Sequence, residues 1–372
     1  MRTPPAAALR IDRVELRAYT LPLAAPFRAP DRVHRERRGM LVRLIDAAGR
    51  EAWGESAPFP GLRAEPFEAA AAQLADVLPE LRGRALPADL PDLAGGCARW
   101  LGAGLLPSVR FGLESAALGL LAAAAGKPLR ALLAPEPAPR VPINALFDGF
   151  EPDLPARAAA LRAAGFRAFK LQAGQRGAAA DIAAATELRG VLGAGPLIRI
   201  DAKCAWRLPE AVAIGRALAP LGIDYIEEPL ADRRDLAPFH AATGIATALD
   251  ENLAPCLAGG AAPPRGVRAF VIKPDLVGGL EAAAELCRRA RACGATPVIS
   301  ATFMSGVGVR VLAEFAAALA PPDVPMGLGT SAWLAEDLYP IPVAGGHIEL
   351  ASLPPEIRLA GAGGRPRLDL RR

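Results

Sequence analysis

Two patterns of apolar positions divide the first third of the chain. Residues 10–55 have short apolar runs interrupted by polar residues, in IDRVELRAYTLPL and in GMLVRLIDAAGREAWGESAP, with a turn at Asp46–Gly49. This pattern predicts the strands of a β-meander. From Pro66 to about Ala125 the pattern becomes helical, in FEAAAAQLADVLPEL and VRFGLESAALGLLAAAAG, and Gly126 and Pro128 end the second helix. An α+β segment is therefore expected before the main domain.

From Val141 onward, short apolar runs alternate with alanine-rich amphipathic stretches. Strands are expected in VPINALF, FRAFKLQ, LIRIDAK, YIEEPL, ATALDEN, FVIKPDL and TPVISAT, and helices over 152–164, 178–192, 208–220, 233–243, 278–293 and 306–320. Such alternation indicates a parallel sheet, and its near-regular period favours a closed barrel over an open doubly wound sheet, which remains the alternative.

Composition excludes several classes of protein. The five cysteines are scattered without a C-x-x-C pair, which argues against a disulfide framework or a zinc site. The net charge is +4, but the arginines are spread out and form no basic stripe for nucleic acid. The one cluster, Arg35, Arg37 and Arg38, is expected in a solvated loop, with substrate contact as the alternative. No long apolar run or signal peptide is present, so a cytoplasmic protein without membrane association is expected.

The basic residues are strongly biased toward arginine. Only Lys127, Lys170, Lys203 and Lys273 are lysines, and the other 39 are arginines. Arginine cannot lose its proton near neutral pH, whereas a buried lysine can be tuned to do so. Three of the four lysines lie at the ends of expected strands, where a β/α barrel places its active residues.

Carboxylates also recur at the strand ends. Asp201, Glu227 and Asp250 are spaced by 26 and 23 residues, about one strand–helix step each, so successive strands present one carboxylate apiece to a common mouth. Three carboxylates without histidine or cysteine suit Mg²⁺, with Mn²⁺ as an alternative ion. Glu228 and Glu251 each follow a ligand candidate by one residue, so we expect them to support the ligands.

Lysines that flank a metal-bound carboxylate substrate suit abstraction of an α-proton through an enediolate intermediate. We therefore expect Lys170, Lys203 and Lys273 to be catalytic. Substrate-binding or supporting roles are expected for Gln172, Asn144, Glu251, Ser300 and Met304.

At these residues the sequence resembles the enolase superfamily, in particular its muconate-lactonizing subgroup, and most closely o-succinylbenzoate synthases and N-acylamino acid racemases. The matching segments are WGESAPFPG, PSVRFGLESA, FKLQAG, RIDAKCAW, YIEEPL, TALDENL, VIKPDLVGG, ISATFMSGVG and GLGTSAWLAEDL, which span nearly the whole chain. The resemblance implies that Asp201, Glu227 and Asp250 bind Mg²⁺. It also implies a capping domain whose loops near residues 24–38 and 56–63 close over the substrate.

The expected fold class is thus α/β, a modified (β/α)7β-type TIM barrel with an N-terminal α+β capping domain. The expected boundaries are 1–135 for the capping domain and 136–325 for the barrel with its metal site. Residues 326–372 would form a C-terminal segment that packs back on the capping domain.

The chain departs from the family pattern in its lysines. Where the family has Lys-x-Lys, this chain has Lys170-Leu171-Gln172, and where the family has Asp-x-Asn, it has Asp201-Ala202-Lys203. Gln172 cannot take a proton. We hypothesise that Lys203 replaces the missing base and that Lys170 lowers its pKa by like-charge repulsion. Met304 stands where relatives often carry an acidic residue.

The resemblance implies a lyase, with syn-dehydration of a cyclohexadiene-type hydroxy acid to o-succinylbenzoate as the leading function. A racemase or epimerase of N-acylamino acids or dipeptides, a cycloisomerase and a catalytically reduced metal-binding homologue remain alternatives. The expected partner is a small-molecule carboxylate substrate, and homo-oligomerisation is left open.

Overall fold

The computed structural model describes residues 9–28, 33–59, 65–151, 153–354 and 356–359. The expected capping loops near 24–38 and 56–63 fall partly outside these ranges, at residues 29–32 and 60–63. No helix in the described part of the chain combines the length and the apolar character needed to cross a membrane.

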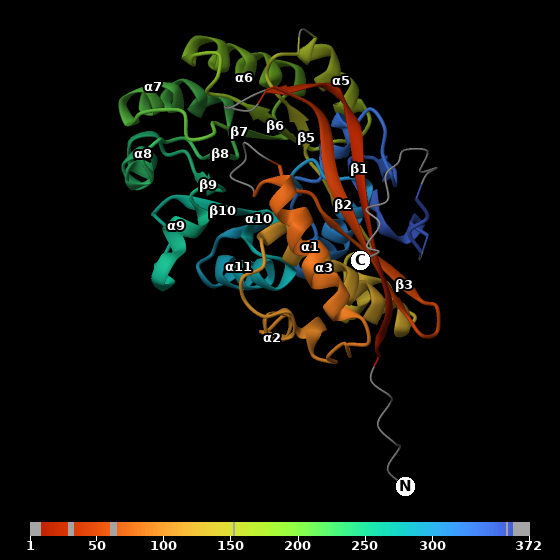
Figure 1. The fold of residues 1–372 in the computed structure, drawn as a ribbon. Helices are drawn as coiled ribbons and strands as arrows, with labels where there is room; N and C mark the ends of the chain where they lie inside the picture. The colour runs from red at the N-terminus through yellow and green to blue at the C-terminus, as the bar shows by residue number, and fades with distance from the viewer. Residues whose placement is uncertain (1–8, 29–32, 60–64, 152, 355, 360–372) are drawn as a thin grey trace.

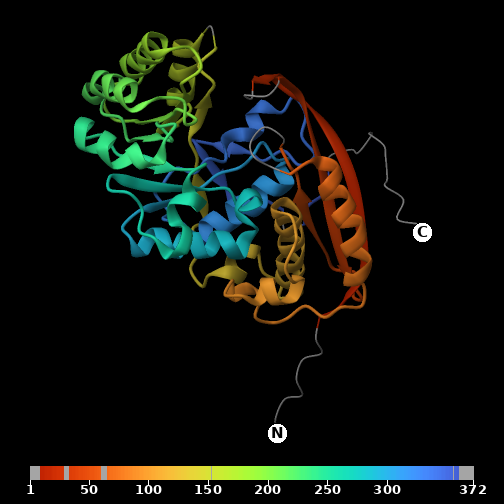
Figure 2. The same cartoon turned by 60° about the vertical axis from the view of Figure 1, so that its left-hand side comes forward.

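The N-terminal strands form the expected antiparallel meander. Strands β1 (Ile11–Arg28), β2 (Val33–Asp46) and β3 (Glu51–Ser56) pair in the order β1-β2-β3. At the turn after β2, the Gly49 amide donates to the Asp46 carbonyl, and Gly49 has a φ of 80°, which glycine adopts without strain. The sheet lies along one side of the molecule with α1 beside it, opposite the helices of residues 150–250 (Figure 2).

Helices α1 (Phe67–Leu81), α2 (Gly96–Leu101), α3 (Pro107–Ala124) and α4 (Leu129–Leu133) follow. The buried residues of α1 recur at helical spacing: Phe67, Ala70, Leu74, Leu78 and Leu81. Helix α3 is buried along most of its length and packs against β3 so closely that Gly54 faces the main chain of Gly112. A side chain larger than hydrogen at either glycine would separate the two elements.

Seven parallel strands form the second sheet, in the order β11-β10-β9-β8-β7-β6-β5. Their bounds are β5 Ala145–Phe147, β6 Ala168–Gln172, β7 Leu197–Asp201, β8 Tyr225–Glu227, β9 Thr247–Leu249, β10 Val267–Ile272 and β11 Thr296–Ile299. The helices between and after them are α5 Leu154–Ala163, α6 Ala178–Leu192, α7 Leu208–Leu218, α8 Leu236–Thr243, α9 Leu253–Leu257, α10 Pro274–Val277, α11 Leu280–Ala292 and α12 Gly306–Leu319. Figure 1 shows α5 to α8 along the outer side of the strands.

The segment at Met326–Gly327 bridges the two ends of this curled sheet. Met326 pairs with Ile143 just before β5, and Gly327 pairs with Ser300 just after β11. The main chain at 326–327 donates to Pro142 and Ile299, and accepts from Asn144 and Ala301. The sheet therefore curls as a modified barrel rather than opening into a doubly wound sheet, as the sequence predicted.

The remaining short strands lie at the beginning and end of the barrel. Strand β13 (His347–Glu349) pairs with β12 (Val343–Ala344) and with β4 (Arg140–Pro142). The 3₁₀ turns are Leu90–Asp92, Ala219–Leu221, Arg233–Asp235, Ala258–Gly260, Gly329–Trp333 and Leu350–Ser352. The C-terminal segment also contacts the first sheet, because Leu334 forms a bridge with Leu23.

The structure differs from the expected helices at two places. The helix expected over 278–293 is divided into α10 and α11 at Gly278 and Gly279, whose φ angles of 105° and 102° do not belong to a helix. The short helix α9 lies between β9 and β10, where no helix was expected.

Candidate active site

The charged residues singled out in the sequence meet at the carboxyl ends of the parallel strands. Asp201 ends β7 and Glu227 ends β8, and the register pairs these two residues directly. On the opposite side of β7 from Glu227, Asp201 pairs with Gln172 at the end of β6. Asp250 and Lys273 directly follow β9 and β10. The recurrence at strand ends therefore becomes a cluster in space.

Three ammonium groups contact the three carboxylates of Asp201, Glu227 and Asp250. The Lys170 Nζ lies 2.8 Å from Asp201 Oδ2 and 2.8 Å from Glu227 Oε1. The Lys203 Nζ lies 2.9 Å from the same Asp201 oxygen. On the other side of the cluster, the Lys273 ammonium donates to Asp250 Oδ2. Positive and negative side chains thus balance in a buried setting.

These ion pairs shift the pKa values in opposite directions. Burial would raise the pKa of the Asp201 carboxyl, but Lys170 and Lys203 hold it below its usual value. Burial, followed by the charge of Asp201, raises the pKa of the Glu227 carboxyl to about 8. Burial would lower the pKa of the Lys203 amine, but Asp201 and Glu251 raise it well above its usual value.

The expectation that Lys170 lowers the pKa of Lys203 is therefore wrong for this arrangement. The charge of Lys203 does oppose the positive charge of Lys170, yet the pKa of Lys170 is also raised, because Asp201 and Glu227 outweigh burial and the neighbouring amine. Like-charge repulsion between two lysines is the weaker effect when each contacts a carboxylate at ion-pair distance.

The donor set of the three carboxylates fits a hard divalent cation. All are side-chain oxygens, and Asp201 and Glu227 are almost completely buried. Glu227 Oε2 is buried and accepts no hydrogen bond from the described residues, so one oxygen of the set is left to a ligand.

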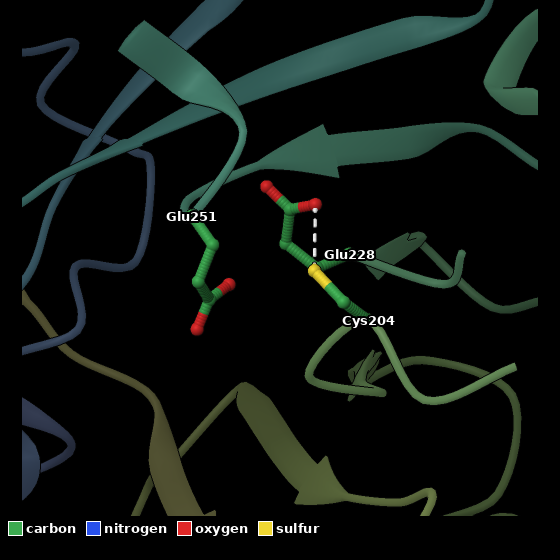
Figure 3. Close-up of side chains that lie close together, drawn as sticks. All are labelled: Cys204, Glu228 and Glu251. Carbon is green, nitrogen blue, oxygen red and sulfur yellow. Dashed lines mark hydrogen bonds between the residues drawn. The ribbon is translucent and has the colours of Figure 1, made fainter. Parts of the chain in front are cut away.

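A second cluster lies beside the first and contains Cys204, Glu228 and Glu251, whose side-chain ligand atoms lie within 4.8 Å of one another (Figure 3). Glu228 accepts hydrogen bonds from the main-chain amide of Asp250 at 2.6 Å, and from the main-chain and side-chain amides of Asn252 at 2.7 and 2.6 Å. The Cys204 thiol also donates to Glu228, at 3.5 Å. Glu228 therefore holds the loop that carries Asp250.

The backbone around these residues is strained. Lys203, Cys204 and Glu228 have φ angles of 52°, 58° and 44°, in the left-handed region that side chains other than glycine rarely occupy. Such conformations persist where the surrounding structure imposes them, and they concentrate at functional sites. They direct Lys203 and the Glu228 carboxylate toward their partners.

The cavity at this mouth is small, with a volume of about 50 Å³. Its polar lining includes Asn144, Lys170, Gln172, Asp201, Lys203, Glu227, Lys273, Ser300 and Thr330. The expected contact residues Asn144, Gln172 and Ser300 are thus at the cavity wall.

Met304 is not at the wall. Its side chain is completely buried and packs near Gly308, whereas the preceding Phe303 lines the cavity. A direct cavity contact is thus not found for Met304, whereas its supporting role stays a prediction. Phe303, with a φ of 56°, lies at the wall instead.

The apolar side of the mouth is an aromatic cluster that the sequence did not reveal. We define it as Phe27, Phe59, Phe303 and Trp333. The Phe27 and Phe303 rings lie 4.6 Å apart between centroids, and both line the cavity. These residues come from the ends of the chain and from loops, so no local periodicity connects them.

One polar residue of the site was missed, and one basic residue near it was misread. The Thr330 hydroxyl is buried at the cavity and has no hydrogen-bond partner among the described residues. Arg37 is only 1% exposed and donates to main-chain carbonyls, so it is neither a solvated loop residue nor a cavity residue.

Comparisons with known proteins show which family the chain is similar to. A family model described as Enolase C-terminal domain-like matches residues 153–354, and one described as MenC, N-terminal domain matches residues 11–120. An o-succinylbenzoate synthase of Citrobacter koseri is 35% identical over 318 residues, covering 84% of this chain and 88% of that protein.

Two other similarities widen the comparison. The chloroplastic protein PHYLLO of Arabidopsis thaliana is 33% identical over 82% of this chain, although the chain spans only 20% of its length. The solved dipeptide epimerase of Methylococcus capsulatus, complexed with Mg and the dipeptide L-Arg-D-Lys, is 25% identical, with a TM-score of 0.79 over 92% of this chain and 97% of that chain.

Proposed function

The chain belongs to the enolase superfamily, and on this premise we propose that it catalyses an o-succinylbenzoate synthase-like syn-dehydration of a hydroxy-cyclohexadiene carboxylic acid. It is an enzyme of the lyase class. The observation that carries the proposal is the pairing of three strand-end carboxylates with lysines on both sides of them, Lys170 and Lys203 on one and Lys273 on the other.

We propose that Asp201, Glu227 and Asp250 hold a divalent cation, Mg²⁺ in the first place and Mn²⁺ as an alternative. The Mg-bound epimerase of similar fold supports this assignment, as does the unpartnered Glu227 oxygen. When bound, the cation supplies positive charge that stabilises the negative charge developing on the substrate carboxylate.

The proton transfer is assigned to the lysines of this chain. In the ion pairs described above Lys203 is an ammonium group, because Asp201 and Glu251 raise its pKa. A cation held by Asp201 would compete for the oxygen that Lys203 contacts and would lower this pKa. As the neutral amine, Lys203 would then accept the proton from the carbon α to the carboxylate. The same group then returns a proton to the departing hydroxyl, so a C–H and a C–O bond break, a C=C bond forms and water leaves. One base on one face is sufficient for a syn-elimination. Gln172 cannot transfer a proton and is left to hydrogen-bond the substrate.

Lys273 has a different task in this scheme. It approaches from β10, on the side away from Lys170 and Lys203, and pairs with Asp250. As an ammonium group it would stabilise negative charge on the substrate without exchanging a proton.

The test is conversion of the hydroxy-cyclohexadiene carboxylate to o-succinylbenzoate by the purified chain with Mg²⁺, measured by mass spectrometry. Lys203→Ala should lower kcat by about 10²–10⁴-fold, the usual contribution of a positioned base. Lys127→Ala is the matched control, because Lys127 is an exposed lysine just after α3. Full activity of Lys203→Ala would refute the relocated base and leave the role to Lys170.

A racemase or epimerase of N-acylamino acids or dipeptides is the second candidate, favoured by the presence of lysines on both sides of the carboxylates. It requires Lys273 to act as an acid or base opposite Lys203. Solvent deuterium entering the α-carbon of such a substrate, with no dehydrated product, would support this function. No exchange with any carboxylate would favour a catalytically reduced homologue.

A further inference from the structure

Arg37 on β2 is a buried cation that the proposed chemistry does not use. Its side chain is 1% exposed. Its Nε donates to the carbonyl oxygen of Phe303 at 3.0 Å, and its Nη1 to those of Arg38 and Pro58, both at 2.7 Å. Its Nη2 donates to the carbonyl of Ala57. One guanidinium thus connects β2, the loop after β3 and the loop after β11.

The acceptors of Arg37 are unusual for a buried arginine. Every hydrogen bond it makes to the described residues goes to a main-chain carbonyl, and the carboxylates of Glu55 and Asp275 act on it only through space. A buried charge is costly unless its hydrogen bonds are satisfied, so the geometry of these carbonyls is fixed around it. The ring of Phe59 also lies 4.9 Å from the guanidinium carbon.

Phe303 is the acceptor that matters for the site. It holds a φ of 56°, which a bulky residue adopts only when its surroundings impose it. Arg37 holds its carbonyl, and two residues later Glu55 accepts from the Ser305 amide at 2.9 Å and the Ser305 hydroxyl at 2.6 Å. With both ends of this short loop held by residues of the first sheet, the Phe303 ring lies against Phe27 at the cavity wall.

We propose that Arg37 is a positioning residue. It holds Phe303 in the left-handed conformation that makes its ring part of the aromatic cluster, and thereby fixes the apolar wall against which the ring of the substrate rests. The nature of that substrate rests on the proposed function, whereas the constraint on Phe303 does not.

The experiment compares Arg37→Met and Arg37→Lys with Arg43→Met. Arg43 is a matched control, because it lies on the same strand, is partly buried, and pairs with Glu15 and Glu51 within the first sheet. Hydrogen–deuterium exchange of the peptide 299–309 needs no substrate. We expect Arg37→Met to increase exchange in this peptide at least tenfold, Arg37→Lys to restore part of the protection, and Arg43→Met to leave it unchanged.

Kinetics test the consequence for the substrate. Arg37→Met should raise KM for the cyclohexadiene acid about tenfold with a smaller change in kcat. In a Phe303→Gly background, where the ring is absent and glycine accepts the positive φ, Arg37→Met should change KM less than twofold.

Two results would overturn the inference. The first is that the peptide 299–309 exchanges deuterium equally fast in Arg37→Met and Arg43→Met. The second is that Arg37→Met raises KM in the Phe303→Gly background as much as it does in the wild type. If Arg37→Met does not fold, Arg37→Lys can decide the question. Hydrogen–deuterium exchange and a KM equal to those of the wild type in Arg37→Lys would also refute the inference, because lysine cannot donate to all four carbonyls. Absence of any dehydration by the wild-type chain would refute the proposed function alone, and the exchange measurement would still decide the role of Arg37.

Discussion

Replacing Glu228 with glutamine should weaken Mg²⁺ binding although Glu228 is not a proposed ligand. The Glu228 carboxylate accepts three hydrogen bonds at 2.6–2.7 Å, two of them from main-chain amides on either side of Glu251 and one from the Asn252 side chain. The first of these amides belongs to Asp250, a proposed ligand. Glu228 therefore determines where the Asp250 carboxylate points.

The cost of the substitution follows from these contacts. Glutamine keeps one oxygen for the two main-chain amides, but these bonds lose their charge assistance, which is worth about 1 kcal/mol each. The NH₂ group of the new glutamine would also face the NH₂ group of the Asn252 side chain. Because both groups are hydrogen-bond donors, this contact lowers the free energy of unfolding by about 1–2 kcal/mol more. Burial raises the pKa of Glu228, so removing its charge returns part of this loss. We expect a net destabilisation of about 2 kcal/mol.

The decisive measurement is a calorimetric titration with Mg²⁺ beside urea unfolding. Loss of a group that orients a metal ligand typically lowers metal affinity 10–100-fold. Glu281→Gln is the matched control, because Glu281 also accepts three amides, those of Gly95, Cys97 and Ala98 at the start of α2. It should lose similar stability without losing Mg²⁺ affinity. Equal Mg²⁺ affinities in the two variants would refute the reasoning.

Two further predictions concern the packing of α3. Burial raises the pKa of the Glu114 carboxyl from 4.5 to about 7, so the stability it contributes is complete below pH 4.5 and is lost as pH rises through 7. At pH 8, the free energy of unfolding of Glu114→Gln, measured with urea, should therefore exceed that of the wild type by about 2 kcal/mol. At pH 4.5 the variant should have no such advantage. A stability difference between variant and wild type that is the same at both pH values would contradict this. Gly54→Ala places a Cβ 1.8 Å from the Gly112 carbonyl oxygen and should cost about 3 kcal/mol or more in the same assay, whereas a cost under about 1 kcal/mol would show that α3 can shift.

The parts of the site that the sequence predicted depend on regular structure. Asp201 and Glu227 could be placed together because parallel strands bring their carboxyl ends to one edge, and the register confirms it. The helix over 178–192 was also predicted to the residue, since its alanine-rich pattern runs between Gly177 and Gly193. Local periodicity and turn residues carry such information.

The parts that could not be predicted depend on contacts between distant segments. Arg37 lies 266 residues from the carbonyl it holds, and nothing in its neighbourhood distinguishes it from the solvated Arg38. Phe303 lines the cavity because of a backbone angle that its residue type disfavours. The ionisation of Lys203 likewise depends on how close the carboxylates come, which spacing along the chain does not give.

The register of two strands brings Gln172 and Lys203 close to Asp201. Gln172 pairs with Asp201, and Lys203 follows Asp201 by two residues, so both positions border the same carboxylate. The left-handed backbone at Lys203 turns its side chain back toward Asp201 Oδ2, the oxygen that Lys170 also contacts. Two ammonium groups therefore contact Asp201, one from β6 and one from the segment after β7. Under the proposed function, Lys203 approaches the substrate from the end of β7, and this direction would decide which face of the substrate loses its proton.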